Sequence, residues 1–363
     1  MKKITIFFCL LLTMGSFIAQ DELTPEEQAF QDSINQVNAS SAATAESQEA
    51  YNKGISLFGQ NKMKEAIQSF DVAINGDPNF QAAYFNKGVA QFKTENFKGT
   101  VATMTQLIKL NDENSKSYFQ RGLANQKLNN LEKALGDYDQ ASFFDLKDPM
   151  AVYNSGTVLF LLGNYEKAIN KFTKCISLKP KYFEAYNDRG SCHRMMSNYD
   201  KALADYKKAG EYGPKEAFVF NNIGTVKKMM KDFEGAKNAY SKAISLDPKF
   251  YLSYNNRGAM LLEQGKKTEA LRDFEKAISL NADYAPAYNN RGMVKHLNKD
   301  YKGAIKDFDR AISLNPNFEN AYANRGASRE MNRDMDGACA DWGTAAELGS
   351  ALGKRYQANN CEF

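Results

Sequence analysis

Residues 251–284 read YLSYNNRGAMLLEQGKKTEALRDFEKAISLNADY, and residues 285–318 read APAYNNRGMVKHLNKDYKGAIKDFDRAISLNPNF. Aligned without a gap, the two stretches share a tyrosine, two asparagines, an Arg-Gly step and the run Ala-Ile-Ser-Leu-Asn. The same glycine returns every 34 residues, at positions 54, 88, 122, 156, 190, 224, 258, 292 and 326. A fixed period of this length predicts an array of repeated structural units.

We number the repeat so that this glycine is position 8, which gives nine repeats, at 47–80, 81–114, 115–148, 149–182, 183–216, 217–250, 251–284, 285–318 and 319–352. Position 4 is aromatic in seven repeats, position 20 is alanine in eight, and position 24 is aromatic in eight. Apolar residues spaced by three and four predict two amphipathic helices per repeat, helix A over positions 4–11 and helix B over positions 20–28. A polar break near positions 15 and 16 separates them, and proline follows helix B in five repeats. One hairpin cannot bury its apolar face alone, so the repeats are expected to stack.

This order of an aromatic residue, glycine, alanine, a second aromatic residue and proline resembles the tetratricopeptide repeat family. The resemblance covers all nine repeats and is weakest in repeat 2, where Thr100 and Met104 occupy positions 20 and 24. It implies an all-α fold, a right-handed α-α superhelix (solenoid) of helix-turn-helix repeats whose A helices line a concave groove. Residues 353–363 are expected to form a C-terminal capping helix, because Tyr356 falls at position 4 of a would-be tenth repeat.

The first 19 residues have the features of a secretory signal peptide. Lys2 and Lys3 precede an apolar run over 4–14, and a small residue follows at Ala19. A membrane anchor is the alternative, but this stretch is shorter than the roughly 20 apolar residues that span a bilayer. We therefore expect an extracytoplasmic protein, periplasmic or secreted, with no integral membrane span in the mature chain.

Residues 20–46 separate the predicted signal peptide from the first repeat. Thr24-Pro25-Glu26-Glu27 has the composition of a helix start, and apolar residues then share one face as far as Val37. We predict a short helix over 25–37 followed by a linker of small and polar residues. A tail without fixed structure is the alternative.

The charge balance and the residue inventory exclude several classes of function. With 47 basic and 43 acidic residues the net charge is +4, which gives no electrostatic reason to expect nucleic acid as a partner. The two histidines, His193 and His296, are too few for a histidine-based metal cluster or catalytic triad. The sequence contains no Cys-x-x-Cys pair, no phosphate-binding glycine loop and no nucleophile elbow. We predict a non-catalytic protein that needs no cofactor.

Five repeats carry arginine at position 7, and the same five carry aspartate at position 23. The pairs are Arg121 with Asp137, Arg189 with Asp205, Arg257 with Asp273, Arg291 with Asp307, and Arg325 with Asp341. The other four repeats have neither residue. Position 7 lies on helix A and position 23 on helix B of one hairpin, so the co-occurrence predicts an Arg–Asp bridge inside each repeat. The alternative is a cationic stripe that binds phosphate groups.

Position 6 carries a side-chain amide in eight repeats. These residues are Asn52, Asn86, Gln120, Asn154, Asn222, Asn256, Asn290 and Asn324, with Asp188 as the exception. Position 5 adds Asn187, Asn221, Asn255 and Asn289 in repeats 5–8. An amide can pair with both groups of an extended backbone, and the family resemblance implies that position 6 faces the groove, where such a ladder holds an extended peptide. The alternative is that these amides bond neighbouring helices within the scaffold, and the two roles are compatible.

The amino-terminal repeats differ from the later ones at the same groove positions. Tyr51, Phe85, Phe119 and Tyr153 occupy position 5, and Phe58 and Phe92 occupy position 12. We predict an apolar first half of the groove, with these aromatic residues as anchors; the alternative is that they belong to the core. In the family, recognition of a free carboxyl terminus implies Lys at position 5 and Asn at position 9 of one repeat. No repeat here has either residue, so that partner class is disfavoured.

Four cysteines remain after the predicted signal peptide. Cys339 lies in helix B of repeat 9 and Cys361 in the predicted cap, and an oxidising compartment would allow a disulfide between them. Cys175 and Cys192 stand at small or apolar core positions and are expected to be buried thiols.

The sequence as a whole indicates an exported, non-catalytic scaffold for protein–protein interaction. Its expected partner is a protein or an extended peptide segment held in the concave groove. The alternative is a structural adaptor in a cell-envelope or secretion assembly that makes contact through its convex face or its edges.

Overall fold

The computed structural model describes residues 45–361, which are helical apart from short connections and contain no strand. The predicted signal peptide and the predicted helix over 25–37 lie outside this range, as does most of the predicted linker. The chain divides into two compact units after Leu146. We call residues 45–146 the N-terminal unit and residues 147–361 the C-terminal unit, and each is described by itself.

The N-terminal unit contains the first three helical hairpins. Its helices are α2 (Ala45–Gly59), α3 (Met63–Gly76), α4 (Gln81–Lys93), α5 (Phe97–Leu110), α6 (Ser115–Lys127) and α7 (Leu131–Phe144). The C-terminal unit contains six more hairpins and a final helix. Its helices are α8 (Pro149–Leu161), α9 (Tyr165–Leu178), α10 (Phe183–Met195), α11 (Tyr199–Tyr212), α12 (Ala217–Met229), α13 (Phe233–Leu246), α14 (Tyr251–Glu263), α15 (Lys267–Leu280), α16 (Ala285–Leu297), α17 (Tyr301–Leu314), α18 (Glu319–Met331), α19 (Met335–Glu347) and α20 (Ala351–Asn360).

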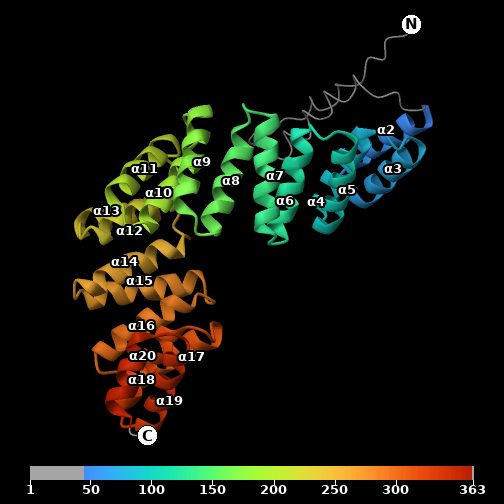
Figure 1. Cartoon of the computed structure of the whole chain (residues 1–363). Coiled ribbons are helices and arrows are strands. Elements are labelled where there is room, and N and C mark those ends of the chain that lie inside the picture. Colours follow the sequence, from blue (N-terminus) through green and yellow to red (C-terminus); the bar gives the residue numbers. More distant parts are fainter. Residues whose placement is uncertain (1–44, 362–363) are drawn as a thin grey trace, which may run out of the picture. The chain divides into compact units, whose positions relative to one another are not determined.

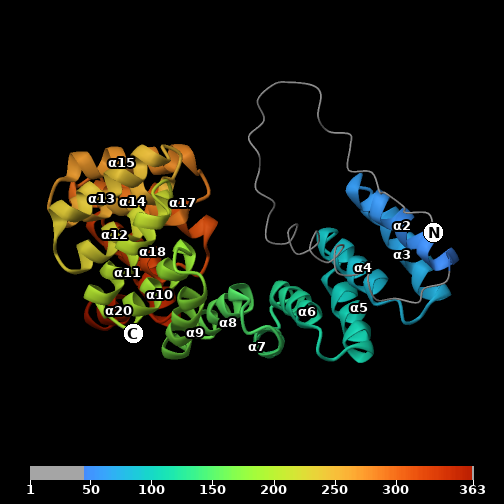
Figure 2. The same cartoon turned by 90° about the horizontal axis from the view of Figure 1, so that it is seen from above.

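Each hairpin pairs an even-numbered A helix with the odd-numbered B helix that follows it (Figure 1). Within each unit, every B helix also packs on the next A helix, and successive A helices touch, as the view from above illustrates for α10 to α14 (Figure 2). This is the expected all-α repeat superhelix. No described helix is long and apolar enough to cross a membrane.

Position 8 is glycine because the two helices of a hairpin approach each other there. A Cβ added to Gly224 would lie 2.7 Å from the ring of Tyr240, and one added to Gly258 would lie 2.8 Å from the ring of Phe274. Any side chain at position 8 would therefore displace the buried aromatic residue at position 24 and separate the helices.

Helix A ends in the same way in all nine repeats. The residue at position 15 has a positive φ each time, for example Asn129 at 59° and Gly265 at 76°. This left-handed residue stops the helix and reverses the chain. The sequence marks the position with Asn or Gly in four repeats only, and Lys231, Lys299 and Arg333 adopt the same conformation.

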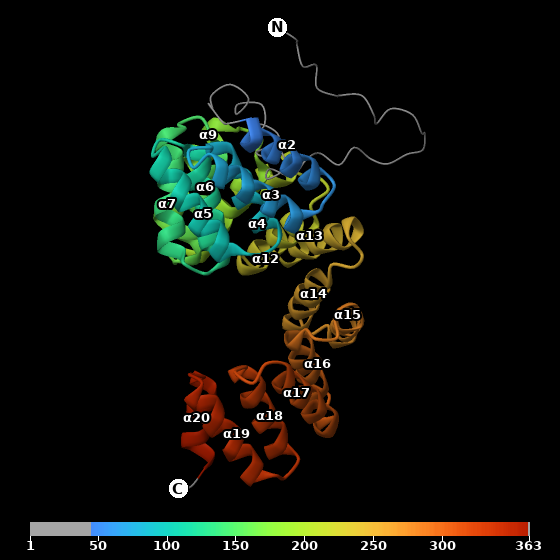
Figure 3. The ribbon, with the colours of Figure 1, turned by 90° about the vertical axis from the view of Figure 1, so that its right-hand side faces the viewer.

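The last helix, α20, closes the apolar end of repeat 9. Tyr356 stacks on Trp342 with ring centroids 5.2 Å apart, and Gly353 lies against Ala345. In Figure 3 α20 lies beside α18 and α19. The helix begins at Ala351, two residues before the predicted cap, because Ser350 caps its amino terminus.

Candidate binding face of the A helices

The five predicted Arg–Asp bridges are confirmed. In each pair the arginine Nη2 lies 2.6–2.8 Å from an aspartate Oδ1, and Nε donates a further hydrogen bond to the same carboxylate. The five aspartates are buried. Hydrogen bonding to Asp273 raises the pKa of the Arg257 guanidinium, which keeps its charge at all working pH values.

Four of these arginines also connect neighbouring repeats. Their Nη1 groups donate to position 25 of the preceding B helix, at Thr105, Thr173, Ser241 and Asp309, over 2.7–3.2 Å. Position 11 adds a second partner for some of the aspartates, as when Lys295 Nζ lies 2.8 Å from Asp307. The guanidinium groups are thus occupied within the scaffold, which argues against a cationic stripe for phosphate.

Most amides at position 6 are hydrogen-bonded between neighbouring A helices, as the scaffold alternative predicted. In five repeats the position-6 Nδ2 donates to the position-5 side chain of the preceding repeat. Four Asn–Asn bonds of 2.9–3.0 Å join Asn222 to Asn187, Asn256 to Asn221, Asn290 to Asn255, and Asn324 to Asn289. Asn86 bonds the hydroxyl of Tyr51 in the same way at 2.8 Å. The ladder therefore holds successive A helices together.

Burial separates the two rows of the ladder. The asparagines at position 5 are buried, so Asn187, Asn221, Asn255 and Asn289 act as internal acceptors rather than as ligand contacts. Asn222, Asn256, Asn290 and Asn324 remain half-buried, and each amide has one N–H that these bonds do not use. A role in peptide binding stays a prediction for this outer row.

The remaining predicted ladder residues are placed differently. Asn52 is exposed and accepts from Gln48, Gln120 is buried, and Asn154 donates to the carbonyl of Met150 one turn earlier in α8. These three amides do not continue the row.

The predicted aromatic anchors belong mostly to the interior. Tyr51, Phe58, Phe85 and Phe92 are buried, and the prediction that they line an open apolar groove is wrong. Tyr51 packs 4.8 Å from Phe80 between ring centroids, in the core of the N-terminal unit. Phe119 and Tyr153 keep part of their surface exposed.

Two hollows open on the A-helix face of the C-terminal unit at equivalent places. One of about 170 Å³ lies between α8 and α10, and one of about 320 Å³ lies between α12 and α14. Both are lined by positions 9, 12, 13 and 24 of one repeat and by positions 6 and 9 of the next. Asn256 is the position-6 residue of the larger hollow. The face therefore has recesses at a spacing of two repeats.

An exposed apolar row runs along the same face, at position 13, the end of helix A. Its members are Leu161, Met195, Met229, Leu297 and Met331, each 43–58% exposed. Glu263 interrupts the row in repeat 7 and pairs with Lys228 at 3.3 Å. We call these five residues the position-13 row. In the sequence this row is visible only as an apolar residue at position 13 in five of the last six repeats.

Comparison with known proteins identifies the family. Two family models described as tetratricopeptide repeat match the sequence, one over residues 251–284 and 285–318 and the other over residues 151–182 and 219–250. The chain is a tetratricopeptide repeat protein. A search of curated proteins gives no match.

Solved tetratricopeptide repeat structures resemble this one at low sequence identity. One from Parabacteroides merdae is 20% identical, covers 69% of this chain and 99% of its own, and has a TM-score of 0.56. The Cut9–Hcn1 assembly of the APC/C is 14% identical over 92% of this chain and 67% of its own, with a TM-score of 0.59. At these identities the likeness shows the fold alone. That fold is one of protein–protein interaction scaffolds, which are generally non-catalytic.

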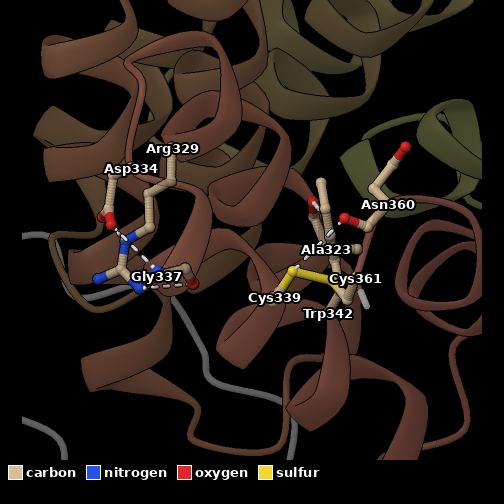
Figure 4. The surroundings of a disulfide bond; sticks show 8 residues. All are labelled: Ala323, Arg329, Asp334, Gly337, Cys339, Trp342, Asn360 and Cys361. Carbon is tan, nitrogen blue, oxygen red and sulfur yellow. Dashed lines mark hydrogen bonds and ion pairs between the residues drawn. A yellow bond between two sulfur atoms is a disulfide. The ribbon is translucent and has the colours of Figure 1, made fainter. Parts of the chain in front are cut away.

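The cysteines of this tetratricopeptide repeat protein fall into two groups. Cys339 and Cys361 are joined by a disulfide that ties α20 to α19, beside Trp342 (Figure 4). Cys175 and Cys192 are free and buried, and burial raises the pKa of both thiols to about 12. These two are unreactive core residues.

The histidines have structural contacts. His296 Nδ1 lies 2.9 Å from Ser328 Oγ, and His193 Nε2 lies 3.9 Å from the Asp205 carboxylate. Within residues 45–361 no group of three or more His, Cys, Asp or Glu side chains is arranged to hold a metal ion.

Proposed function

We propose that this protein is exported and that it holds an extended segment of a partner protein on the A-helix face of its C-terminal unit. The position-13 row is the observation that carries the proposal. Five large apolar side chains stay exposed in register along one face, although a scaffold residue at the end of a helix has no need to be apolar. Three of the five are methionines, whose flexible side chains adapt to varied partner surfaces.

The spacing of the repeats suits an extended chain. Successive A helices touch, and packed helix axes lie about 8–10 Å apart. An extended chain covers that distance in about three residues. A bound segment would therefore offer a side chain to each hollow about every sixth residue, with the outer N–H groups of the position-6 amides beside its backbone.

Export is supported by the disulfide as well as by the sequence of residues 1–19. A bond between Cys339 and Cys361 persists in an oxidising compartment and is rare in a reducing one. Expression of the full chain in a bacterial host should yield an extracytoplasmic product whose intact mass lacks about the first 19 residues, as expected for signal-peptide cleavage. Full-length protein retained in the cytoplasm would contradict the proposal.

The binding proposal is tested with peptides selected for binding to the protein. Random dodecapeptides displayed on phage are selected on the chain lacking residues 1–19, and selected peptides are measured by fluorescence anisotropy. The triple variant Leu161→Lys, Met229→Lys, Leu297→Lys should weaken binding at least tenfold, because it places three charges along the row. The matched control is Leu178→Lys with Leu348→Lys, two exposed leucines at the ends of B helices, which should leave affinity unchanged. Equal affinity of the row variant and the wild type would refute the proposal.

A specific observation favours the adaptor function as a second candidate. The N-terminal unit has a hollow of about 750 Å³ lined by α5, α6 and α7, with Lys98 and Lys133 among its lining residues. If this surface were the docking site, Lys98→Glu with Lys133→Glu would abolish binding of selected peptides, and the row variant would bind normally.

A further inference from the structure

Asp188 is the one residue that breaks the position-6 ladder with a charge. It lies on α10, and the hydroxyl of Tyr153 donates to its Oδ2 at 2.6 Å. Asn187 Nδ2 donates to its Oδ1 at 3.0 Å. The scaffold does not require a carboxylate here, because the equivalent pair in the N-terminal unit is made by an amide, with Asn86 donating to Tyr51.

A second carboxylate lies one turn earlier on the same helix. Glu184 precedes Asp188 by four residues, a spacing that brings the two side chains to one face of α10. Glu184 Oε2 is buried and has no hydrogen-bond partner. Burial raises the pKa of both carboxyl groups, and the charge of Asp188 raises the pKa of Glu184 further. Among the residues that the structure describes, neither Glu184 nor Asp188 forms a salt bridge. The charge of Lys179 lowers the pKa of Glu184, but Lys179 forms no salt bridge with either carboxylate.

The carboxylate of Asp188 lines the smaller hollow. The other lining residues are Thr157, Phe160, Leu161, Phe172 and Ser191, so its walls are mainly apolar. The equivalent hollow between α12 and α14 differs in its charged residues. It has Asn256 where this one has Asp188, and it has Lys228, paired with Glu263, where this one has Phe160. The chain supplies a cation in the second hollow and none in the first.

We propose that the hollow between α8 and α10 receives a lysine side chain of the bound partner, with its ammonium group at Asp188. The inference rests on the proposed function and adds the chemistry of one subsite. Phe160, Leu161 and Phe172 contact the aliphatic stem, which suits apolar walls, while the ammonium group stays at the polar end. The ammonium donates to Asp188, whose two oxygens each keep a lone pair beyond the bonds from Tyr153 and Asn187. Glu184 does not line the hollow, but its charge interacts with that of Asp188 one turn away and favours a cation there.

The test uses two small probes that differ only in the charged group. N-acetyl-lysine amide and N-acetyl-norleucine amide are titrated into the isotope-labelled chain lacking residues 1–19, and backbone amide resonances are followed by NMR. The lysine probe should shift the resonances of Thr157, Asp188 and Ser191 in a saturable manner, at least tenfold more tightly than the norleucine probe. Equal responses to the two probes would overturn the proposal.

Asp188→Asn is the variant that isolates the charge. It reproduces the amide–tyrosine pair seen at Asn86 and should remain folded, as its circular dichroism melting curve will report. It should lose the tenfold preference for lysine. Asp200→Asn, at an exposed carboxylate on α11, is the matched control and should keep that preference. A folded Asp188→Asn protein that still prefers lysine would also overturn the proposal.

These experiments test the lysine subsite separately from the proposed binding of an extended partner segment. If selected peptides bind the position-13 row but the lysine probe shows no preference, the subsite is wrong and the proposed function stands. If the lysine probe binds at Asp188 but no peptide depends on the row, the subsite stands and the extended-segment function is wrong.

Discussion

Arg257 gives two hydrogen bonds to Asp273 and one to Ser241 of the preceding repeat, so one side chain joins three helices. Arg257→Ala should lower the free energy of unfolding by about 3 kcal/mol, because it leaves the buried Asp273 carboxylate unpaired. Lys53→Ala is the control at the same position of repeat 1, where the side chain is exposed and position 23 is Ser69. It should change the free energy by less than about 0.5 kcal/mol. Urea unfolding measures both, and equal effects would contradict the structural role.

Asp188 gives a prediction with a definite pH dependence. Its pKa is raised in the folded protein, mainly by burial, so the native state holds its proton to higher pH than the unfolded chain does. The protein therefore loses stability as the pH rises from the unfolded pKa of about 3.9 to the raised pKa of the folded state. Below the unfolded pKa this loss is absent, because Asp188 is protonated in both states. Asp188→Asn should raise the urea midpoint at pH 7 and have little effect at pH 4. A variant that is less stable than the wild type at pH 7 would contradict this assignment.

At this scale the sequence predicts some contacts well and misses others. The Arg–Asp bridges were predictable because the partners appear and disappear together within single repeats. Bonds between the position-6 amides and neighbouring helices were foreseen as an alternative, but their partners at position 5 were not. That register depends on how the A helices stack. Burial of Phe58 and Phe92 depends on the same stacking, which the 34-residue period does not specify.

The A helices are joined to one another through the ladder, and a triple variant measures its strength. Changing Asn222, Asn256 and Asn290 to Ala removes three donors and leaves the buried acceptors Asn187, Asn221 and Asn255 without them. At about 1 kcal/mol for each bond, the free energy of unfolding should fall by roughly 3 kcal/mol. Asn52→Ala is the control, because Asn52 is exposed and bonds only its own helix. An unchanged stability in the triple variant would show that the ladder does not hold the scaffold.

The terminal helix α20 should depend on its disulfide. The bond closes a loop with a sequence separation of 22, which corresponds to about 3 kcal/mol on the chain-entropy estimate. Non-reducing peptide mass spectrometry should find Cys339 joined to Cys361, and Cys339→Ser with Cys361→Ser should lower the melting temperature. Dithiothreitol should lower it in the wild type but not in that variant. Free thiols at both positions in exported protein would contradict the bond.

Across the whole molecule, the period of 34 residues predicted the number of hairpins, their boundaries to within a few residues, and the capping helix. It did not predict the division after Leu146, since repeats 3 and 4 keep the period there. The aromatic residues of the first repeats, which the sequence analysis assigned to a groove, do not mark a binding face either. Most of them are buried in the core. The position-13 row was present in the sequence, but a single apolar position per repeat has meaning only once helix A is known to end there.

The central claim is that a partner segment lies on the A-helix face of residues 147–361, and photo-cross-linking tests it most directly. A selected peptide carrying benzophenone is irradiated in complex with the chain lacking residues 1–19, and the attachment sites are mapped by mass spectrometry. The account predicts attachment at the position-13 row, with Met229 and Met331 among the sites. Attachment confined to the B helices, or to residues 45–146, would contradict it.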